Sequence, residues 1–438
     1  MRHARIAANR IFAVEHFRMP LLHLADLARR ELRAGVNPGP ALLDSLALAA
    51  IAAQRTLGLR AHLAQMCAAV LALQDRTAEL ACGEGKTLAL LALAAAVRAL
   101  GGMPVHLVVH DDALAPATAR QMKPFFEGLG LAVAAVCRAS DDAARREAYQ
   151  ADICYATADE LMTDDLRNRI AAEPIGFRPS ERACALVDDI DGVLIDGAVT
   201  TTAQFFNRYA RLGGVSATLS EARTELASVY GLGVTAVASI YPCFRRELGL
   251  TVIAGAAAWR RAVVGRVQAL VAARRPVLIV TATEAASRAM VLVLHEGGID
   301  ASVMPAGSHA DWCSVRDTAG RPGAVTLCAA RPGHCDAVAL DPLARSAGGL
   351  AVIATYLGAS RRADRQLGHL TGRQAQPGSV ESIVQFSASG GLAWLPMPVM
   401  RSLVLSRRYL GELRAARERS RQARRLSGRR AHLQHEGR

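Results

Sequence analysis

The sequence predicts an α/β protein with two doubly wound domains in tandem, each built around a largely parallel sheet. Short β-branched runs alternate with helical stretches rich in Ala, Leu and Arg, a pattern typical of parallel sheets. The strand runs fall into two groups, before about residue 200 and after about residue 270. A length of 438 residues and a hydrophobic fraction of 51% are enough for two or three domains with substantial cores.

The first group of elements begins with helices, since apolar residues recur at spacings of three and four over residues 1–60. A short strand pattern at Thr77–Leu80 then opens the α/β part. The further strands expected here are 105–110, 151–157 and 183–188, and the helices between them are 87–99 and 113–129.

The second group follows a link over residues 232–250, which contains Gly231, Gly233, Pro242 and Gly249 within it or at its edge. We therefore expect a first domain over 1–240, a second over 241–398 and a helical tail over 399–438. The strands expected in the second domain are 275–281, 301–305, 324–329, 350–356 and 382–387, and its helices include 257–273 and 284–297.

Composition argues against several classes of protein. The nine cysteines are scattered and form no CxxC, so neither a disulfide framework nor a zinc knuckle is expected, and a reducing cytosol fits better. The first residues lack the apolar region of a secretory signal. No run of about 18 apolar residues predicts a transmembrane helix.

The positive charge is concentrated in the tail. The chain has a net charge of +13, and residues 401–438 hold twelve Arg and three Glu, a net charge of +9. A solvated helix explains this segment; a binding site for anionic lipid, nucleic acid or an acidic partner is the functional alternative. Only two lysines are present, Lys86 and Lys123, and Lys and Arg are not interchangeable, so a retained lysine is a candidate for a position that Arg cannot fill.

A glycine-rich loop lies between the strand pattern at 77–80 and the helix that follows. It reads Gly83-Glu84-Gly85-Lys86-Thr87. Glycines allow a tight loop whose N–H groups face phosphates, and the amides at the start of the helix add positive potential. Lys86 would reach the β- and γ-phosphates of a nucleotide and Thr87 would ligate Mg²⁺. The first glycine of GxxxxGKT is replaced by Leu80.

Acidic residues follow the apolar strand at 183–188, in the order Asp188, Asp189, Ile190, Asp191. This is the pattern of a Walker B strand, in which Asp188 would hold Mg²⁺ through water and Asp189 would position the attacking water. A strand end capped by acidic turn residues is the alternative. In the second domain, Arg373 could act as an arginine finger on the nucleotide, although composition alone, with Arg so frequent, favours a basic surface helix that runs into a loop.

Taken together, these segments resemble the SecA family, the ATPase motors of bacterial preprotein translocation. The resemblance runs in order through most of residues 30–390. Its blocks are AELACGEGKT, VHLVVHDDALA (105–115), YATADELMTDDLRN (155–168), VDDIDGVLIDGAVT (187–200) and SRRADRQLGHLTGRQAQPGS (360–379). The resemblance implies two RecA-like motor domains of the superfamily-two helicase type. It also implies that Gln65 contacts adenine and that Asp336 belongs to the fifth motor motif.

The departures from the family pattern are informative. The blocks that flank the family's preprotein-crosslinking domain nearly abut near residue 200, so we expect that domain to be absent. The tail resembles a stub of the long scaffold helix. The family's catalytic Glu is Asp189 here, and a shift of about 1 Å can cost of order 10²-fold in rate. Leu370 replaces the first motif-six arginine, His334 replaces an arginine of the fifth motif, and Arg373 remains.

The resemblance implies an ATPase with ATP and Mg²⁺ as cofactors, coupled to protein export and attenuated in hydrolysis. It implies a Sec-type translocon or a SecA-like partner, preprotein clients, anionic lipid bound through the Arg-rich tail, and a cytoplasmic location at the inner face of the cell membrane. A non-hydrolysing nucleotide-binding regulator is the first alternative. A nucleic-acid helicase is the second, but an aromatic content of 4% leaves few side chains for base stacking.

Overall fold

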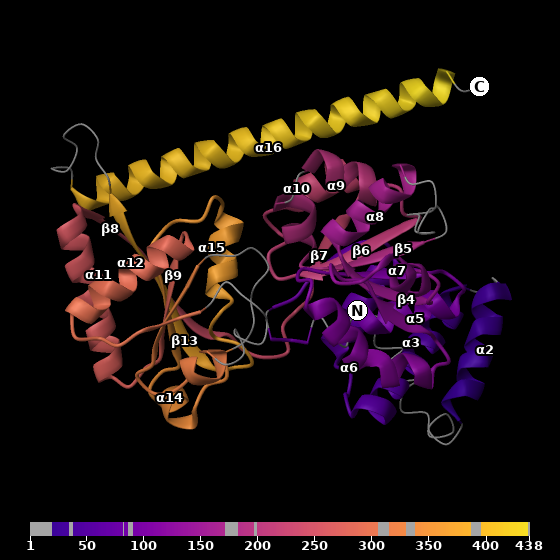
Figure 1. The fold of residues 1–438 in the computed structure, drawn as a ribbon, viewed down its shortest axis with the longest axis horizontal. Coiled ribbons are helices and arrows are strands. Elements are labelled where there is room, and N and C mark those ends of the chain that lie inside the picture. Colours follow the sequence, from indigo (N-terminus) through magenta and orange to yellow (C-terminus); the bar gives the residue numbers. More distant parts are fainter. Residues whose placement is uncertain are drawn as a thin grey trace. The chain divides into compact units, whose positions relative to one another are not determined.

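The computed structural model describes residues 20–34, 38–81, 83–85, 91–170, 183–196, 199–304, 315–329, 338–386 and 396–436 (Figure 1). The chain divides into two compact units. Unit 1 comprises Met1–Ile240 with Arg419–Arg438, and unit 2 comprises Tyr241–Glu418.

Within the described residues, unit 1 contains a seven-stranded sheet in the order β3-β4-β2-β5-β6-β1-β7, and every neighbouring pair is parallel. Its strands are β1 (Arg76–Glu79), β2 (Val105–Val109), β3 (Val133–Ala135), β4 (Ile153–Thr157), β5 (Cys184–Asp188), β6 (Arg211–Ser216) and β7 (Gly233–Ala236). Its helices are α2 (Leu21–Ala34), α3 (Pro38–Leu57), α4 (Leu63–Leu73), α5 (Leu91–Leu100), α6 (Leu114–Gly128), α7 (Asp142–Ala148), α8 (Ala158–Ile170), α9 (Val199–Phe206) and α10 (Arg223–Tyr230).

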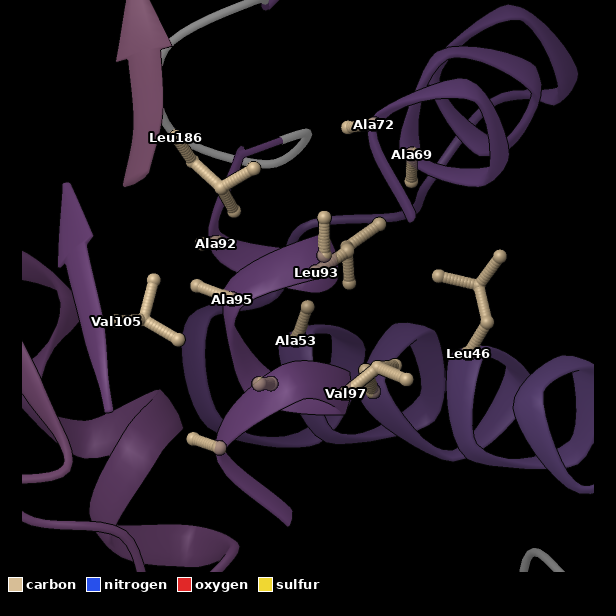
Figure 2. Close-up of a cluster of buried hydrophobic side chains, with 14 of the residues drawn as sticks. Leu46, Ala53, Ala69, Ala72, Ala92, Leu93, Ala95, Val97, Val105 and Leu186 are labelled. Atoms are coloured by element: carbon tan, nitrogen blue, oxygen red, sulfur yellow. The ribbon is translucent and has the colours of Figure 1, made fainter. Parts of the chain in front are cut away.

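Helices cover both faces of this sheet, because alternate strand residues point to opposite faces. On β5, Leu186 packs into a core with α2–α6, whereas Val187 packs into a second core with α7–α10. Buried runs without polar alternation are what a parallel sheet covered on both faces requires. The first core is rich in alanine (Figure 2), for example Ala53 and Ala95, and these small side chains leave room for neighbouring helices to approach closely.

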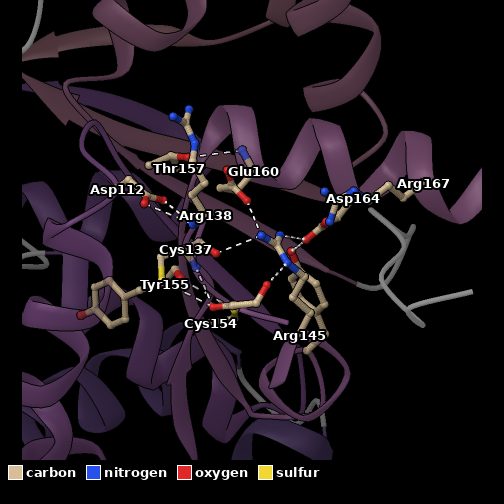
Figure 3. Close-up of polar contacts among 12 residues, drawn as sticks. Asp112, Cys137, Arg138, Arg145, Cys154, Tyr155, Thr157, Glu160, Asp164 and Arg167 are labelled. Atoms are coloured by element: carbon tan, nitrogen blue, oxygen red, sulfur yellow. Dashed lines mark hydrogen bonds and ion pairs between the residues drawn. The ribbon is translucent and has the colours of Figure 1, made fainter. Parts of the chain in front are cut away.

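A buried ion cluster fixes α7 and α8 in unit 1 (Figure 3). Arg145, 2% exposed, donates to Glu160 Oε2 at 2.6 Å and to Asp164 Oδ2 at 2.7 Å. Its Nη2 and Nε also donate to the carbonyl oxygens of Cys137 and Ser140, both at 2.9 Å. Tyr149 adds a hydrogen bond of 2.6 Å from its hydroxyl to Asp164 Oδ2. We call Arg145, Tyr149, Glu160 and Asp164 the arginine cluster; its charges are buried but paired, as burial requires.

Unit 2 has a six-stranded sheet in its described part, again with parallel neighbours, in the order β10-β11-β9-β12-β13-β8. Helices α11 and α12 pack on one face of it. Its strands are β8 (Phe244–Ala254), β9 (Val277–Thr281), β10 (Ser302–Val303), β11 (Val325–Ala329), β12 (Leu350–Ala354) and β13 (Pro377–Phe386), and its helices are α11 (Ala256–Ala272), α12 (Glu284–Glu296), α14 (Pro342–Ser346) and α15 (Arg361–Gly368). Helix α16 (Met397–Glu436) belongs to unit 2 as far as Glu418 and to unit 1 from Arg419.

The first part of α16 is bound to α15 by charged side chains. Arg408 Nη1 donates to Asp364 Oδ2, and Glu412 Oε1 accepts a hydrogen bond of 2.5 Å from the backbone N–H of Arg361. Burial raises the pKa of Asp364, and the neighbouring Arg408 opposes that rise. These contacts hold the beginning of the tail helix against the helix that leads to Arg373.

The sequence located most of these elements, but not the strands near the link. Residues 232–250 contain β7 and more than half of β8, and neither was among the expected strands. Strands β3 and β6 were also missed. β6 reads RLGGVS, and its two glycines lower the strand propensity. Gly214 is nevertheless required, because a Cβ there would lie 2.3 Å from the carbonyl oxygen of Val187 on β5.

Candidate nucleotide site

Three adjacent strands of unit 1 bring the predicted phosphate loop and the acidic residues to one edge of the sheet. β6 lies between β5 and β1, and all three run parallel. Asp188 is the last residue of β5, Ser216 is the last residue of β6, and the loop follows β1. The carboxyl ends of strands in an open α/β sheet are where ligands bind.

The loop has the backbone conformation that its glycines allow. Gly83 and Gly85 have φ angles of +88° and +70°, which side-chain-bearing residues seldom adopt. Before the loop, the N–H of Leu80 donates to the carbonyl oxygen of Ser216 at 2.9 Å, so pairing with β6 continues past the end of β1. Lys86 and Thr87 lie outside the described residues, and their contacts with phosphate and Mg²⁺ remain predictions.

Gln65 lies directly against this loop. It occupies the first turn of α4, where its Oε1 accepts from the N–H of His62 at 2.9 Å and its Nε2 donates to the carbonyl oxygen of Glu84 at 2.8 Å. The side chain is 6% exposed. A Cβ at Gly85 would lie 2.6 Å from Gln65 Nε2, so only glycine fits there without displacing the amide. Gln65 therefore orients the loop; its contact with adenine remains a prediction.

Asp189 is held in a tightly defined position after β5. Its φ angle is +51°, a conformation that costs energy in a residue other than glycine. Its Oδ1 accepts from Ser216 Oγ at 2.9 Å, and its N–H donates to Asp188 Oδ1 at 3.1 Å. A Cβ at Gly192 would lie 2.9 Å from its Oδ2. Backbone strain that surrounding contacts maintain is a feature of functional sites.

Sequence reasoning missed two hydroxyl residues that hold the acidic segment. Besides Ser216, Thr218 donates from Oγ1 to Asp191 Oδ2 at 2.6 Å, and Asp191 is fully buried. The signal was available: Ser216 and Thr218 end an apolar run, as Asp188 does. It was not recognised because the run itself did not predict a strand.

The donor set at this edge suits Mg²⁺, which prefers hard oxygen ligands and commonly takes one or two carboxylates together with substrate phosphates and water. Asp188 and Asp189 place two successive carboxylates at the end of β5, and Asp188 is 7% exposed. Across the described part of the chain, no group of three or more His, Cys, Asp or Glu side chains forms a metal cluster. An ion at this edge would share its coordination between these carboxylates and the substrate phosphates.

Burial controls the titration of groups on neighbouring strands. The pKa of Tyr155 on β4 is raised by burial and further by the charge of Asp188, so its hydroxyl keeps its proton. His106 on β2 is fully enclosed, and burial lowers its pKa to about 4. Its Nδ1 shares a hydrogen bond of 2.8 Å with the Tyr209 hydroxyl. The neutral imidazole is therefore a structural element of the sheet.

Arg373 belongs to unit 2 and lies in the turn between α15 and β13. Its Nε donates to the carbonyl oxygen of His369 at 2.7 Å. The turn is compact: Gln374 and Ala375 both have positive φ angles, of +50° and +59°. Leu370 packs against the second core of this unit, as its apolar side chain allows. Asp336 and His334 lie outside the described residues, so their places in the fifth motif remain predictions.

Two family models match the chain in order. The SecA DEAD-like domain matches residues 19–202, and the SecA P-loop domain matches residues 242–342. The chain belongs to the SecA family. The protein translocase subunit SecA 2 of Nitrosospira multiformis is 26% identical over 75% of this chain and 73% of its own length. The SecA 2 of Rhodopseudomonas palustris is 27% identical over 81% of this chain and 63% of its own length.

Identity to other SecA relatives is higher over shorter stretches. The SecA 2 of Mycolicibacterium smegmatis is 40% identical over 179 residues, which are 41% of this chain and 22% of that protein. This alignment spans less than a quarter of the relative's length, so the sequence similarity covers only part of that protein.

Solved structures show the same fold at low identity. Saccharomyces cerevisiae Dbp5 bound to RNA and ADP BeF3 has a TM-score of 0.57 at 14% identity, covering 87% of this chain and 92% of Dbp5. The DUF1998 helicase MrfA bound to DNA also has a TM-score of 0.57, at 12% identity, covering 82% of this chain and 53% of MrfA. The two parallel sheets are thus RecA-like domains, as the resemblance implied. No helix in the described residues is both long and apolar enough to span a membrane.

Proposed function

We propose that the chain is a SecA-like ATP-binding motor protein in which ATP hydrolysis is coupled to protein export and is attenuated. The observation that carries the proposal is the shared edge of β1, β6 and β5, where the phosphate loop, Ser216 and the pair Asp188 and Asp189 end together. Family membership supports the same function. In this proposal residues 1–240 form the first nucleotide-binding domain, residues 241–398 the second and residues 399–438 a basic tail.

Each residue then has a chemical task. Loop N–H groups and Lys86 bind the phosphates, and Thr87 and Asp188 hold the ion. Bound Mg²⁺ would neutralise charge on the transferring phosphoryl group. Asp189 orients the attacking water, Gln65 and Glu84 keep the loop in its binding conformation, and Arg373 stabilises the charge that develops on the nucleotide.

Attenuation is supported by the way Asp189 is held. Its carboxylate is one methylene shorter than that of the family's Glu, and it is retained by the Ser216 hydroxyl at 2.9 Å. A carboxylate set back by about 1 Å from its productive place costs of order 10²-fold in rate. Loss of an arginine that neutralises transition-state charge, as at Leu370, costs of order 10³-fold. The same two observations favour a second candidate, a partner subunit that binds nucleotide without hydrolysing it.

The proposal also assigns partners and a location. In the expected absence of the preprotein-crosslinking domain, a Sec-type translocon or a SecA-like partner would bind the preprotein. The chain would be cytoplasmic and peripheral at the inner face of the cell membrane. There the basic end of α16 would contact anionic lipid.

The test is a steady-state ATPase assay on the whole chain, run beside binding of a fluorescent ATP analogue. Lys86→Ala is the blank, and Lys123→Ala is the matched control because Lys123 is an exposed lysine paired with Glu127 on α6. Slow turnover that disappears only in Lys86→Ala supports the motor. Binding of the analogue without turnover supports the partner subunit that does not hydrolyse nucleotide. The absence of both binding and turnover contradicts both candidate functions.

A further inference from the structure

The segment by which the chain leaves unit 1 lies beside the phosphate loop. We call residues 237–240 the exit segment, because the first stretch of unit 1 ends at Ile240 and unit 2 begins at Tyr241. The segment continues from β7, which pairs with β1, and the N–H of Val237 donates to the carbonyl oxygen of Glu79 at 2.9 Å. The exit segment therefore runs alongside the chain that leads into the loop.

Glu84 joins the loop to this segment. Its Oε1 accepts a hydrogen bond from the hydroxyl of Ser239 and another, of 2.8 Å, from the N–H of Ile240. Its own carbonyl oxygen accepts from Gln65 at 2.8 Å. The residue is thus anchored through its backbone to α4 and through its side chain to the last residues of unit 1.

The carboxylate of Glu84 is poorly satisfied for a buried acid. The residue is 5% exposed, and among the described residues its Oε2 has no hydrogen-bond partner although water cannot reach it. Burying a carboxylate with half of its acceptor capacity unused is costly. Among the described residues, this buried acid is therefore held to the exit segment through Oε1.

We propose that Glu84 is a positioning residue that couples nucleotide occupancy of the phosphate loop to the exit segment, a role that rests on the proposed nucleotide binding. Phosphates bound to the loop N–H groups restrict the loop to the conformation in which the Glu84 side chain reaches Ser239 and Ile240. Nucleotide therefore strengthens the hold on the exit segment. By thermodynamic linkage, the hold on the exit segment strengthens nucleotide binding equally.

The first measurement is amide hydrogen exchange at the N–H of Ile240, which reports one of the two contacts directly. We expect the non-hydrolysed analogue AMP-PNP with Mg²⁺ to slow exchange at this amide by about fivefold or more, the lower range of coupling between sites. Ser239→Ala should reduce this protection, and Glu84→Ala should abolish it. Bound analogue that leaves Ile240 exchange unchanged would overturn the proposal.

The second measurement is the reciprocal effect on affinity. Ser239 is 155 residues from Glu84 in sequence, yet Ser239→Ala should weaken analogue binding by about fivefold. The matched control is Ser220→Ala, which removes a hydrogen bond of the same kind to Glu79 without touching the exit segment. Thermal unfolding of both variants verifies that they fold.

The outcomes separate the two proposals. Equal affinities of Ser239→Ala and Ser220→Ala would overturn the coupling while leaving nucleotide binding intact. Failure of the unaltered chain to bind the analogue would overturn nucleotide binding, and the coupling with it.

Discussion

Replacing Gly85 by alanine should disable the nucleotide loop through two separate costs. A φ angle of +70° costs a residue with a Cβ about 1–2 kcal/mol. The new Cβ would also lie 2.6 Å from Gln65 Nε2, so the amide must move. Gln65 then loses its bonds to the backbone of Glu84 and His62, at about 1 kcal/mol each.

The two costs together are about 3–4 kcal/mol, so we expect the affinity for a fluorescent ATP analogue to fall by roughly 10²- to 10³-fold. Gly231→Ala is the control, because Gly231 has the same φ of +70° but no atom within 4 Å of the place that its Cβ would take. That variant should lose about 1–2 kcal/mol of stability with unchanged affinity. A Gly85→Ala affinity within about threefold of the unaltered chain would refute the reasoning.

Three further outcomes are expected. Arg145→Met removes the guanidinium that pairs with both Glu160 and Asp164 and, among the described residues, leaves Asp164 only the 3.6 Å ion pair with the exposed Arg167, so urea unfolding should show a loss of about 3–5 kcal/mol. Arg169→Met, at the surface, should lose less than about 1 kcal/mol, and equal losses in the two variants would contradict this role of Arg145. Burial lowers the pKa of His106 to about 4, so as pH falls the unfolded chain takes up a proton on this imidazole before the folded chain does. The free energy of unfolding should therefore be highest above pH 6.5 and decline towards pH 4 by up to roughly 3 kcal/mol. His106→Gln should remove that part of the decline in urea unfolding, and an unchanged pH profile would refute the explanation. Asp189→Glu should raise kcat up to the order of 10²-fold if the short carboxylate limits hydrolysis, whereas no gain in steady-state turnover would place the limit elsewhere.

Strand prediction succeeded where burial on both faces produced an unbroken apolar run. β2, β4 and β5 were located within two residues because VHLVV, ICYAT and CALVD carry that signal by themselves. β6 and β7 carry glycines, and β8 is an edge strand whose residues are largely exposed, so none of the three has such a run. Their identity as strands depends on their neighbours, which periodicity in a single segment does not reveal.

The candidate site, like the strands, was predictable from local sequence only in part. Asp188 follows an apolar strand, and the loop glycines precede a helical pattern, so local sequence was sufficient to place both. The partners of Asp189 and Glu84 were not predictable, because Ser216 reaches Asp189 through the pairing of β5 with β6, and Ser239 reaches Glu84 through the pairing of β1 with β7. Contacts between residues distant in sequence follow from strand order, and the order of parallel strands is set by the assembled sheet.

The position of β1 between β6 and β7 has a consequence for synthesis of the chain. A ribosome that has released the first 200 residues has supplied both the phosphate loop and the acidic segment, but neither strand that flanks β1. Parallel pairing over such separations is slow, because the loop-closure entropy must be lost before the contacts form. The nucleotide loop, encoded within the first hundred residues, is therefore among the last parts of unit 1 to mature, and a nascent chain ending before residue 240 should not retain ATP.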